Sequence, residues 1–84
     1  MRSFNEGDLI VAPDIDRTLM MKIKPDDLEI TNGIVLSAYP VSLYDAWNPG
    51  TSQNLVRVSV LMPSGKLRWY YDAELEIFYG LQGM

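Results

Sequence analysis

The alternation of apolar and polar residues in NLVRVSVLMPSGKLRWYYD, residues 54–72, constrains the fold of this chain more than any other feature. Two runs with a period of two flank a Pro-Ser-Gly-Lys turn, which is typical of a β-hairpin. A two-residue loop of Ser64 and Gly65 and a four-residue loop of 63–66 give the same cross-strand pairing. The hairpin is therefore predicted with either of these loops.

That pairing divides the hairpin into an apolar face and a mainly polar face. The apolar face pairs Met62 with Leu67, Val60 with Trp69, and Val58 with Tyr71. The polar face pairs Leu61 with Arg68, Ser59 with Tyr70, and Arg57 with Asp72. A three-residue loop would shift one strand by a residue and mix the two faces, so we do not expect it. Trp69 and Tyr71 are predicted in the core, and Tyr70 is predicted on the outside.

Shorter strand signals lie on both sides of the hairpin. Residues 7–13 and 33–40 are apolar runs that each end at a proline, and residues 76–78 are a candidate closing strand after a 3₁₀ turn at 73–75. The long segment 14–32 contains a candidate strand at 19–23 and one helical turn starting at Pro25. Because no stretch sustains a period of 3.6, the prediction is an all-β fold. It is a small five-stranded antiparallel barrel with long first and second connecting loops.

The length of 84 residues accommodates one hydrophobic core. We therefore predict a single domain over 1–84, with a core of about 6–79 and a tail at 80–84 that is flexible or bound to a partner.

Three segments together resemble the SH3-like barrels of the KOW and Tudor type: EGDLIVAP, NGIVLSAYP and VRVSVLMPSGKLRWYYDAELEIF. The pattern is similar, more closely, to short SH3-like proteins of tailed bacteriophages. The resemblance covers residues 6–79 and implies a 3₁₀ turn and closing strand in DAELEIF. It also implies a role as a virion or assembly protein, or in binding nucleic acid or a peptide. These motifs describe barrel geometry and carry no chemistry.

Composition argues against catalysis and cofactors. The chain has no cysteine and no histidine, which excludes Ser-His and Cys-His nucleophile systems, disulfides and thiolate metal sites. No Walker motif is present. Acidic residues in the first long loop are interpreted as solvated rather than as a Ca²⁺ or Mg²⁺ site at Asp14 and Asp16. We predict no enzyme activity, no cofactor and no metal.

Charge and hydropathy bear on partners and location. A net charge of −4, from 11 acidic and 7 basic residues, argues against non-specific nucleic-acid binding. The start MRSFNEGD has no apolar signal region, and no apolar run approaches the roughly 20 residues that span a bilayer. We expect a protein that is cytoplasmic at synthesis, with virion association if the phage resemblance holds, and no membrane partner.

The second long connection, residues 40–54, is the first candidate contact region. It exceeds ordinary hairpin loops of about 2–5 residues and carries Tyr44 and Trp47 among turn formers. Trp47 either caps the open end of the barrel or contacts a partner, and the sequence leaves both placements open.

A second candidate region is the predicted outer face of the hairpin, where an aromatic ring, a leucine and an arginine coincide. Adjacent methionines in the first long loop suit an adaptable interface. The predicted partner-binding residues are Tyr44, Trp47, Leu61, Arg68, Tyr70, Met20 and Met21.

These observations predict a non-catalytic module that binds other protein subunits, in a homo- or hetero-oligomeric assembly. Two alternatives stay open: a KOW-like nucleic-acid adaptor, and a Tudor-like peptide reader. The reader would use aromatic residues at one rim of the barrel to cage a cation, with Tyr39, Tyr44, Trp47 and Tyr70 as candidates.

Overall fold

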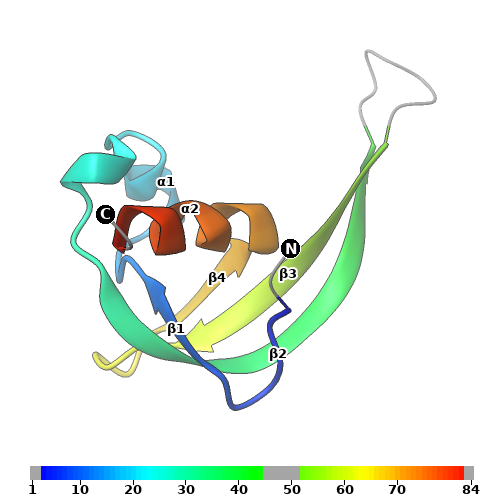
Figure 1. Ribbon diagram of the computed structural model, residues 1–84, viewed down its shortest axis with the longest axis horizontal. Coiled ribbons are helices and arrows are strands. Elements are labelled where there is room, and N and C mark those ends of the chain that lie inside the picture. Colours follow the sequence, from blue (N-terminus) through cyan, green and yellow to red (C-terminus); the bar gives the residue numbers. More distant parts are fainter. Residues whose placement is uncertain (1–2, 45–51, 83–84) are drawn as a thin grey trace.

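The computed structural model describes residues 3–44 and 52–82, and four antiparallel strands form a curled half-barrel with the order β1-β2-β3-β4 (Figure 1). The strands are β1 (Leu9–Ala12), β2 (Thr31–Tyr44), β3 (Ser52–Leu61) and β4 (Leu67–Tyr71). The helices are α1 (Arg17–Met20), the 3₁₀ helix η1 (Pro25–Asp27) and α2 (Asp72–Gln82). None of the described helices is long and apolar enough to cross a bilayer.

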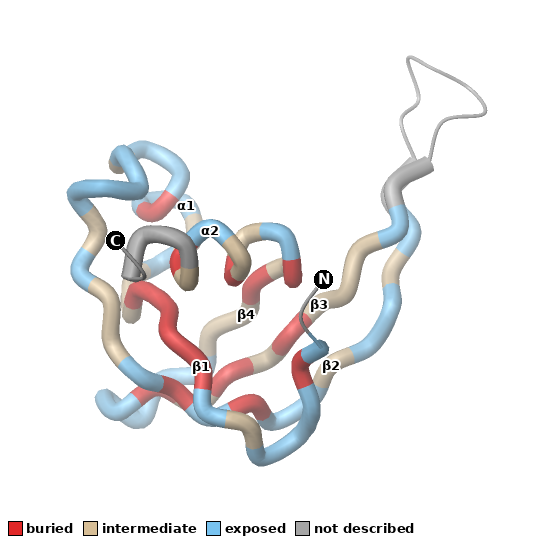
Figure 2. Tube along the Cα trace, viewed as in Figure 1, coloured by how far each residue is buried: buried red, intermediate tan, exposed pale blue. Residues whose placement is uncertain are grey.

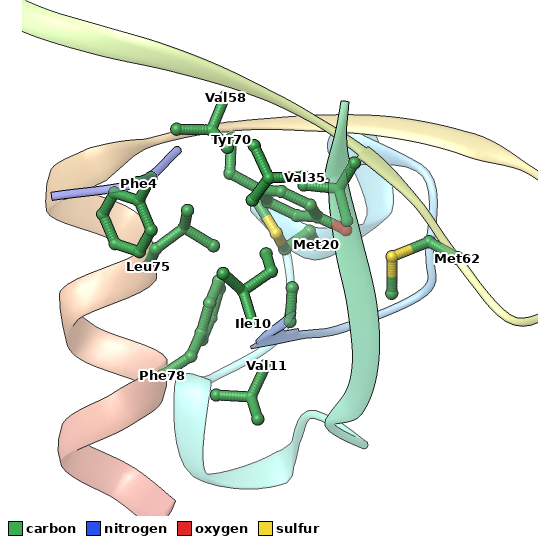
Figure 3. Close-up of a cluster of buried hydrophobic side chains, with 12 residues drawn as sticks. Phe4, Ile10, Val11, Met20, Val35, Val58, Met62, Tyr70, Leu75 and Phe78 are labelled. Atoms are coloured by element: carbon green, nitrogen blue, oxygen red, sulfur yellow. The ribbon is translucent and has the colours of Figure 1, made fainter. Parts of the chain in front are cut away.

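The core lies between the concave side of the sheet and α2, as Figures 1 and 2 show. Leu75 and Phe78, three residues apart on α2, meet side chains from all four strands (Figure 3). The buried apolar residues are Phe4, Ile10, Val11, Ala12, Met20, Val35, Val58, Val60, Met62, Tyr70, Leu75 and Phe78. A helix rather than the predicted closing strand therefore follows β4, and it covers the concave side of the sheet.

Two features of β2 produce the curl. The register between β2 and β3 shifts between Val35 and Ser37, and such a bulge bends and twists a strand. Gly33 lets β3 approach closely, because a Cβ at this position would lie 2.5 Å from Cγ1 of Val60 and 2.9 Å from the sulfur of Met62.

The hairpin between β3 and β4 has a three-residue loop, so the predicted register is wrong by one residue. The Met62 amide donates to the Lys66 carbonyl at 3.0 Å, and the Gly65 amide donates to the Met62 carbonyl at 2.9 Å. Gly65 has φ of 86°, the left-handed conformation that the last residue of such a loop adopts and that glycine tolerates. The observed pairs are Arg57–Tyr71, Val58–Tyr70, Ser59–Trp69, Val60–Arg68 and Leu61–Leu67.

The predicted 3₁₀ turn and closing strand at 73–78 are also wrong, because this segment belongs to α2. Side chains at its start satisfy backbone donors that a strand would have paired. Asp72 Oδ1 accepts from the amides of Val56 and Ala73, and Glu74 Oε1 accepts from the amide of Tyr71 at 2.8 Å. The described residues thus contain four strands rather than five, and positions 80–82 of the predicted tail are helical.

The remaining predicted elements agree with the structure only in part. The strands predicted at 7–13 and 33–40 correspond to β1 and β2, and the helical turn predicted at Pro25 is η1. The candidate strand at 19–23 is wrong, since α1 ends at Met20. The long loop predicted at 40–54 is largely strand, because β2 continues to Tyr44 and β3 begins at Ser52.

Candidate functional site

The side of the sheet opposite the core, called the outer face below, carries the most distinctive surface chemistry of the described chain. Val58, Val60 and Tyr70 are buried on the concave side. Their sequence neighbours therefore point the other way, because side chains alternate along a strand. Cross-strand pairing joins Tyr39 to Arg57 and Arg57 to Tyr71 on this outer face.

Two arginines and three aromatic residues form a cluster there: Arg17, Tyr39, Arg57, Trp69 and Tyr71. The guanidinium carbons of Arg17 and Arg57 lie 4.0 and 4.1 Å from the centre of the Trp69 ring, within cation–π range. Arg17 is also 5.1 Å from the ring of Tyr71. Trp69 and Tyr71 meet edge to face with ring centres 5.1 Å apart. We call these five residues the arginine–aromatic cluster.

The two arginines of the cluster differ in their counter-charges. Arg17 donates through both terminal nitrogens to the two carboxylate oxygens of Glu74, each at 2.9 Å. Glu74 is itself fixed by the Tyr71 amide, so Arg17 is neutralised and positioned by the start of α2. The side chain of Arg57 has no hydrogen bond or ion pair to any described residue, and its Nε is buried without a partner. The cluster therefore presents one uncompensated cation.

Beyond the cluster, β2 and β3 continue as a two-stranded arm, Pro40–Tyr44 paired with Ser52–Val56. The last pair between β3 and β4 is Arg57–Tyr71. The Asp72 carboxylate accepts a hydrogen bond from the Val56 amide at the position where the next backbone bond between β3 and β4 would form. Figure 1 shows the arm leading away from α2 and the rest of the sheet. An isolated two-stranded hairpin is marginally stable in water, so this arm would gain stability from a partner.

The structure places the predicted contact residues in different environments. Leu61 lies on the outer face, as predicted, and Met21 is 74% exposed. Tyr44 ends β2, and its side chain is outside the described part of the chain. Trp47 lies outside the described residues altogether.

Three of the predicted contact residues do not lie on an open surface. Tyr70 is buried, and its hydroxyl donates to the carbonyl oxygen of Pro13. Arg68 faces the concave side, where its Nε donates to Asp14 Oδ1 at 3.0 Å. Met20 is in the core. The one-residue register shift explains Tyr70 and Arg68, because it exchanges the two faces of β4.

The same shift moves Trp69 and Tyr71, predicted in the core, onto the outer face, where both are half-buried. It also separates the residues predicted for a cage, since Tyr39 and Tyr70 lie on opposite faces of the sheet. Sequence reasoning missed Arg17, Arg57 and Trp69 as one cluster. The Pro-Ser-Gly run was the available signal, because glycine in third place favours the three-residue loop.

Asp14, in the first long loop, makes a structural contact with Arg68, whereas the other acidic residues of this loop are exposed. Hydrogen bonds from Ser64 and Arg68 hold the pKa of the Asp14 carboxyl below its usual value of 3.8. Within residues 3–44 and 52–82, no group of three or more Asp or Glu side chains is arranged to hold a metal ion.

Comparison of the chain with protein-family models, curated proteins and solved structures gives no match.

Proposed function

We propose that this chain is a non-catalytic protein–protein interaction module that serves as a structural or assembly component. The observation that carries the proposal is the arginine–aromatic cluster at the base of the arm. Arginine, tryptophan and tyrosine are the residues most enriched where interfaces derive their binding energy. The uncompensated Arg57 suits a partner that brings a carboxylate to this surface.

The arm supports the same function. Tyr39 at its base is 45% exposed, and Val41 and Leu55 are half-buried. Backbone groups along the outer edges of a two-stranded arm are available to a further strand from a partner. Trp47, in the segment between the two strands of the arm, stays a predicted contact residue.

A narrower identity follows only from the sequence resemblance. We propose an SH3-like barrel in which α2 takes the place of the closing strand, acting in the neck, tail or capsid region of a phage virion. The curled antiparallel sheet is compatible with this placement.

Protein is favoured over nucleic acid or a methylated peptide as the partner. The net charge is −4, and Arg17 is neutralised by Glu74, which leaves little positive charge to contact phosphates. The Trp69 ring is already in contact with two of the chain's own guanidinium groups, which compete with a ligand cation.

Site-specific photo-crosslinking in cells of the source organism tests the proposal. A crosslinking amino acid at Tyr39 should capture one defined protein, and Arg57→Gln or Trp47→Ala should reduce the yield several-fold. The matched control is the same crosslinker at Ile77, which is exposed on α2. Equal capture at both positions would contradict the proposed surface. Recovery of RNA or DNA, lost steeply with added salt, would instead support the adaptor alternative.

A further inference from the structure

A row of four aliphatic side chains crosses the outer face at the end farther from the arm, with one residue from each strand. Leu9 pairs with Ile34, Ile34 pairs with Leu61, and Leu61 pairs with Leu67. Directly paired residues share a face, so the four side chains form a continuous line across the sheet. Leu9, Ile34 and Leu67 are 72%, 43% and 68% exposed, and Leu61 is half-buried. We call these four residues the aliphatic row.

A hollow of about 330 Å³ lies within this end of the outer face. Its lining is Leu9, Asn32, Gly33, Ile34, Leu61, Met62 and Pro63. Leu67 is the one member of the row that does not line the hollow, and it projects beside it. The same surface thus offers both an aliphatic projection and an apolar recess that accepts one.

The exposed area of the row is large for a chain of this size. With roughly 120 Å² of apolar area per aliphatic side chain, the exposed fractions leave roughly 300 Å² open, including the neighbouring Leu36. A stable interface of the smaller kind buries about 600 Å² on each partner, a little over half of it apolar. The row therefore supplies most of the apolar area that such an interface needs.

We propose that the aliphatic row is a self-association surface, and that its partner is a second copy of this chain. A two-fold axis along the strands, between β2 and β3, sets Leu67 of one copy against Leu9 and the hollow of the other. The same axis sets Ile34 against Leu61. Both contacts then occur twice, as a closed two-fold interface requires. The row contains no ionisable side chain, so two copies that each carry a charge of −4 meet where repulsion is least.

The row lies on the same outer face as the arginine–aromatic cluster but consists of different residues, with Leu67 two positions from Trp69 on β4. Self-association through the row is a contact that the proposed function does not include, so the inference goes beyond it.

Sedimentation equilibrium of the full chain, from low micromolar to submillimolar concentration, tests the proposal. The chain should approach twice the mass of one copy as concentration rises, and added salt should preserve or strengthen the dimer because it screens the net charge. Leu67→Lys should weaken dimerisation about tenfold or more, since it places a charge against Leu9 and the apolar hollow of the other copy. Ile77→Lys is the matched control: Ile77 is 52% exposed on α2, at the opposite side of the sheet.

A second readout, which does not depend on the folding of a variant, is the change in amide NMR chemical shifts when the unmodified chain is diluted. The shifts should concentrate in residues of the row and the hollow. A single-chain mass at every concentration would overturn the proposal, as would a dimer that Leu67→Lys leaves intact. With the crosslinker at position 39, Arg57→Gln should keep the dimer and lose crosslinked partner, so failure of this inference and failure of the proposed function give different results.

Discussion

The hydroxyl of Tyr70 donates a hydrogen bond to the backbone carbonyl of Pro13 inside the core. This bond joins β4 to the segment that follows β1, 57 positions away in sequence. The Tyr70 ring also meets Phe78 of α2 edge to face, with ring centres 6.1 Å apart. One side chain therefore ties together β4, the end of β1 and the covering helix, as its central position in Figure 3 shows.

Replacing Tyr70 with phenylalanine should lower the free energy of unfolding by about 1–3 kcal/mol. The ring contacts would remain, but the buried Pro13 carbonyl would lose its donor. Urea titration followed by circular dichroism measures the change. Tyr39→Phe is the matched control and should be nearly neutral, because Tyr39 is 45% exposed. Equal losses in both variants would show that the buried bond contributes nothing specific.

Stability should also fall in alkali because of Tyr70. Burial raises the pKa of its hydroxyl from 10.0 to about 12. Below pH 10 the neutral phenol is present in both states, and its contribution to stability is complete. Between pH 10 and about 12 the unfolded chain releases the proton while the folded chain retains it, so stability decreases as pH rises. Urea midpoints across this range should decline less steeply in Tyr70→Phe than in the unmodified chain.

Gly33→Ala should destabilise the fold by about 1–3 kcal/mol, because the new methyl group would overlap Cγ1 of Val60. Adding Val60→Ala removes that atom and should recover part of the loss, so that the double variant costs less than the two single changes together. The free energies of unfolding of the four proteins measure this coupling. Asn32→Ala, at an exposed neighbouring position, is the control. Strict additivity would show that the close approach at Gly33 is not the cause.

The local sequence predicts where the strands lie but not the register between them. Period-two alternation identifies β3 and β4, and prolines and turn residues locate β1 and the start of β2. The register depends on a loop that accepts two, three or four residues, and both faces of β4 carry aromatic rings. The choice between Trp69 and Tyr70 for the core is made by distant groups. Pro13 offers a buried acceptor to Tyr70, and Arg17 offers a cation to Trp69.

Helix α2 also could not be predicted from its local sequence. EIF, residues 76–78, is predicted as a strand because aromatic and β-branched residues favour extended structure. The helix forms because Asp72 and Glu74 satisfy amides at its start, and because Leu75 and Phe78 reach the core together. Sequence reasoning placed Arg57 of the arginine–aromatic cluster on the same polar face as Leu61, and both lie on the outer face. The pairing of Arg17 with Glu74, 57 positions apart, leaves no local signal.

The pKa of Asp14 should report the Arg68 contact directly. In the unmodified chain the carboxyl should titrate below 3.8, because Ser64 and Arg68 donate hydrogen bonds to its ionised form. A group with a lowered pKa contributes stability that is complete above its usual value and is lost as pH falls through the folded value. Arg68→Gln should therefore move the titration of Asp14 toward 3.8, as measured by carboxyl ¹³C NMR. Ser64 would sustain any remaining shift, and an unchanged titration would contradict the contact.

The contact between Arg17 and Glu74 should be worth about 0.5–1 kcal/mol in a double-mutant cycle built from Arg17→Gln and Glu74→Gln. Both side chains are 25% exposed, which places the pair between a solvent-screened and a buried ion pair, and the two parallel bonds favour a measurable coupling. Glutamine retains an oxygen for the Tyr71 amide, so the cycle isolates the charge contact from the start of α2.

Trp69 provides an independent readout, since loss of Arg17 removes a cation 4.0 Å from its ring and should change its fluorescence. Glu29→Gln, at an exposed loop position, should show no coupling to Arg17. A coupling no larger than that of this control would mean that Arg17 is held by its ring contacts alone, and Glu74→Gln would then leave the Trp69 signal unchanged.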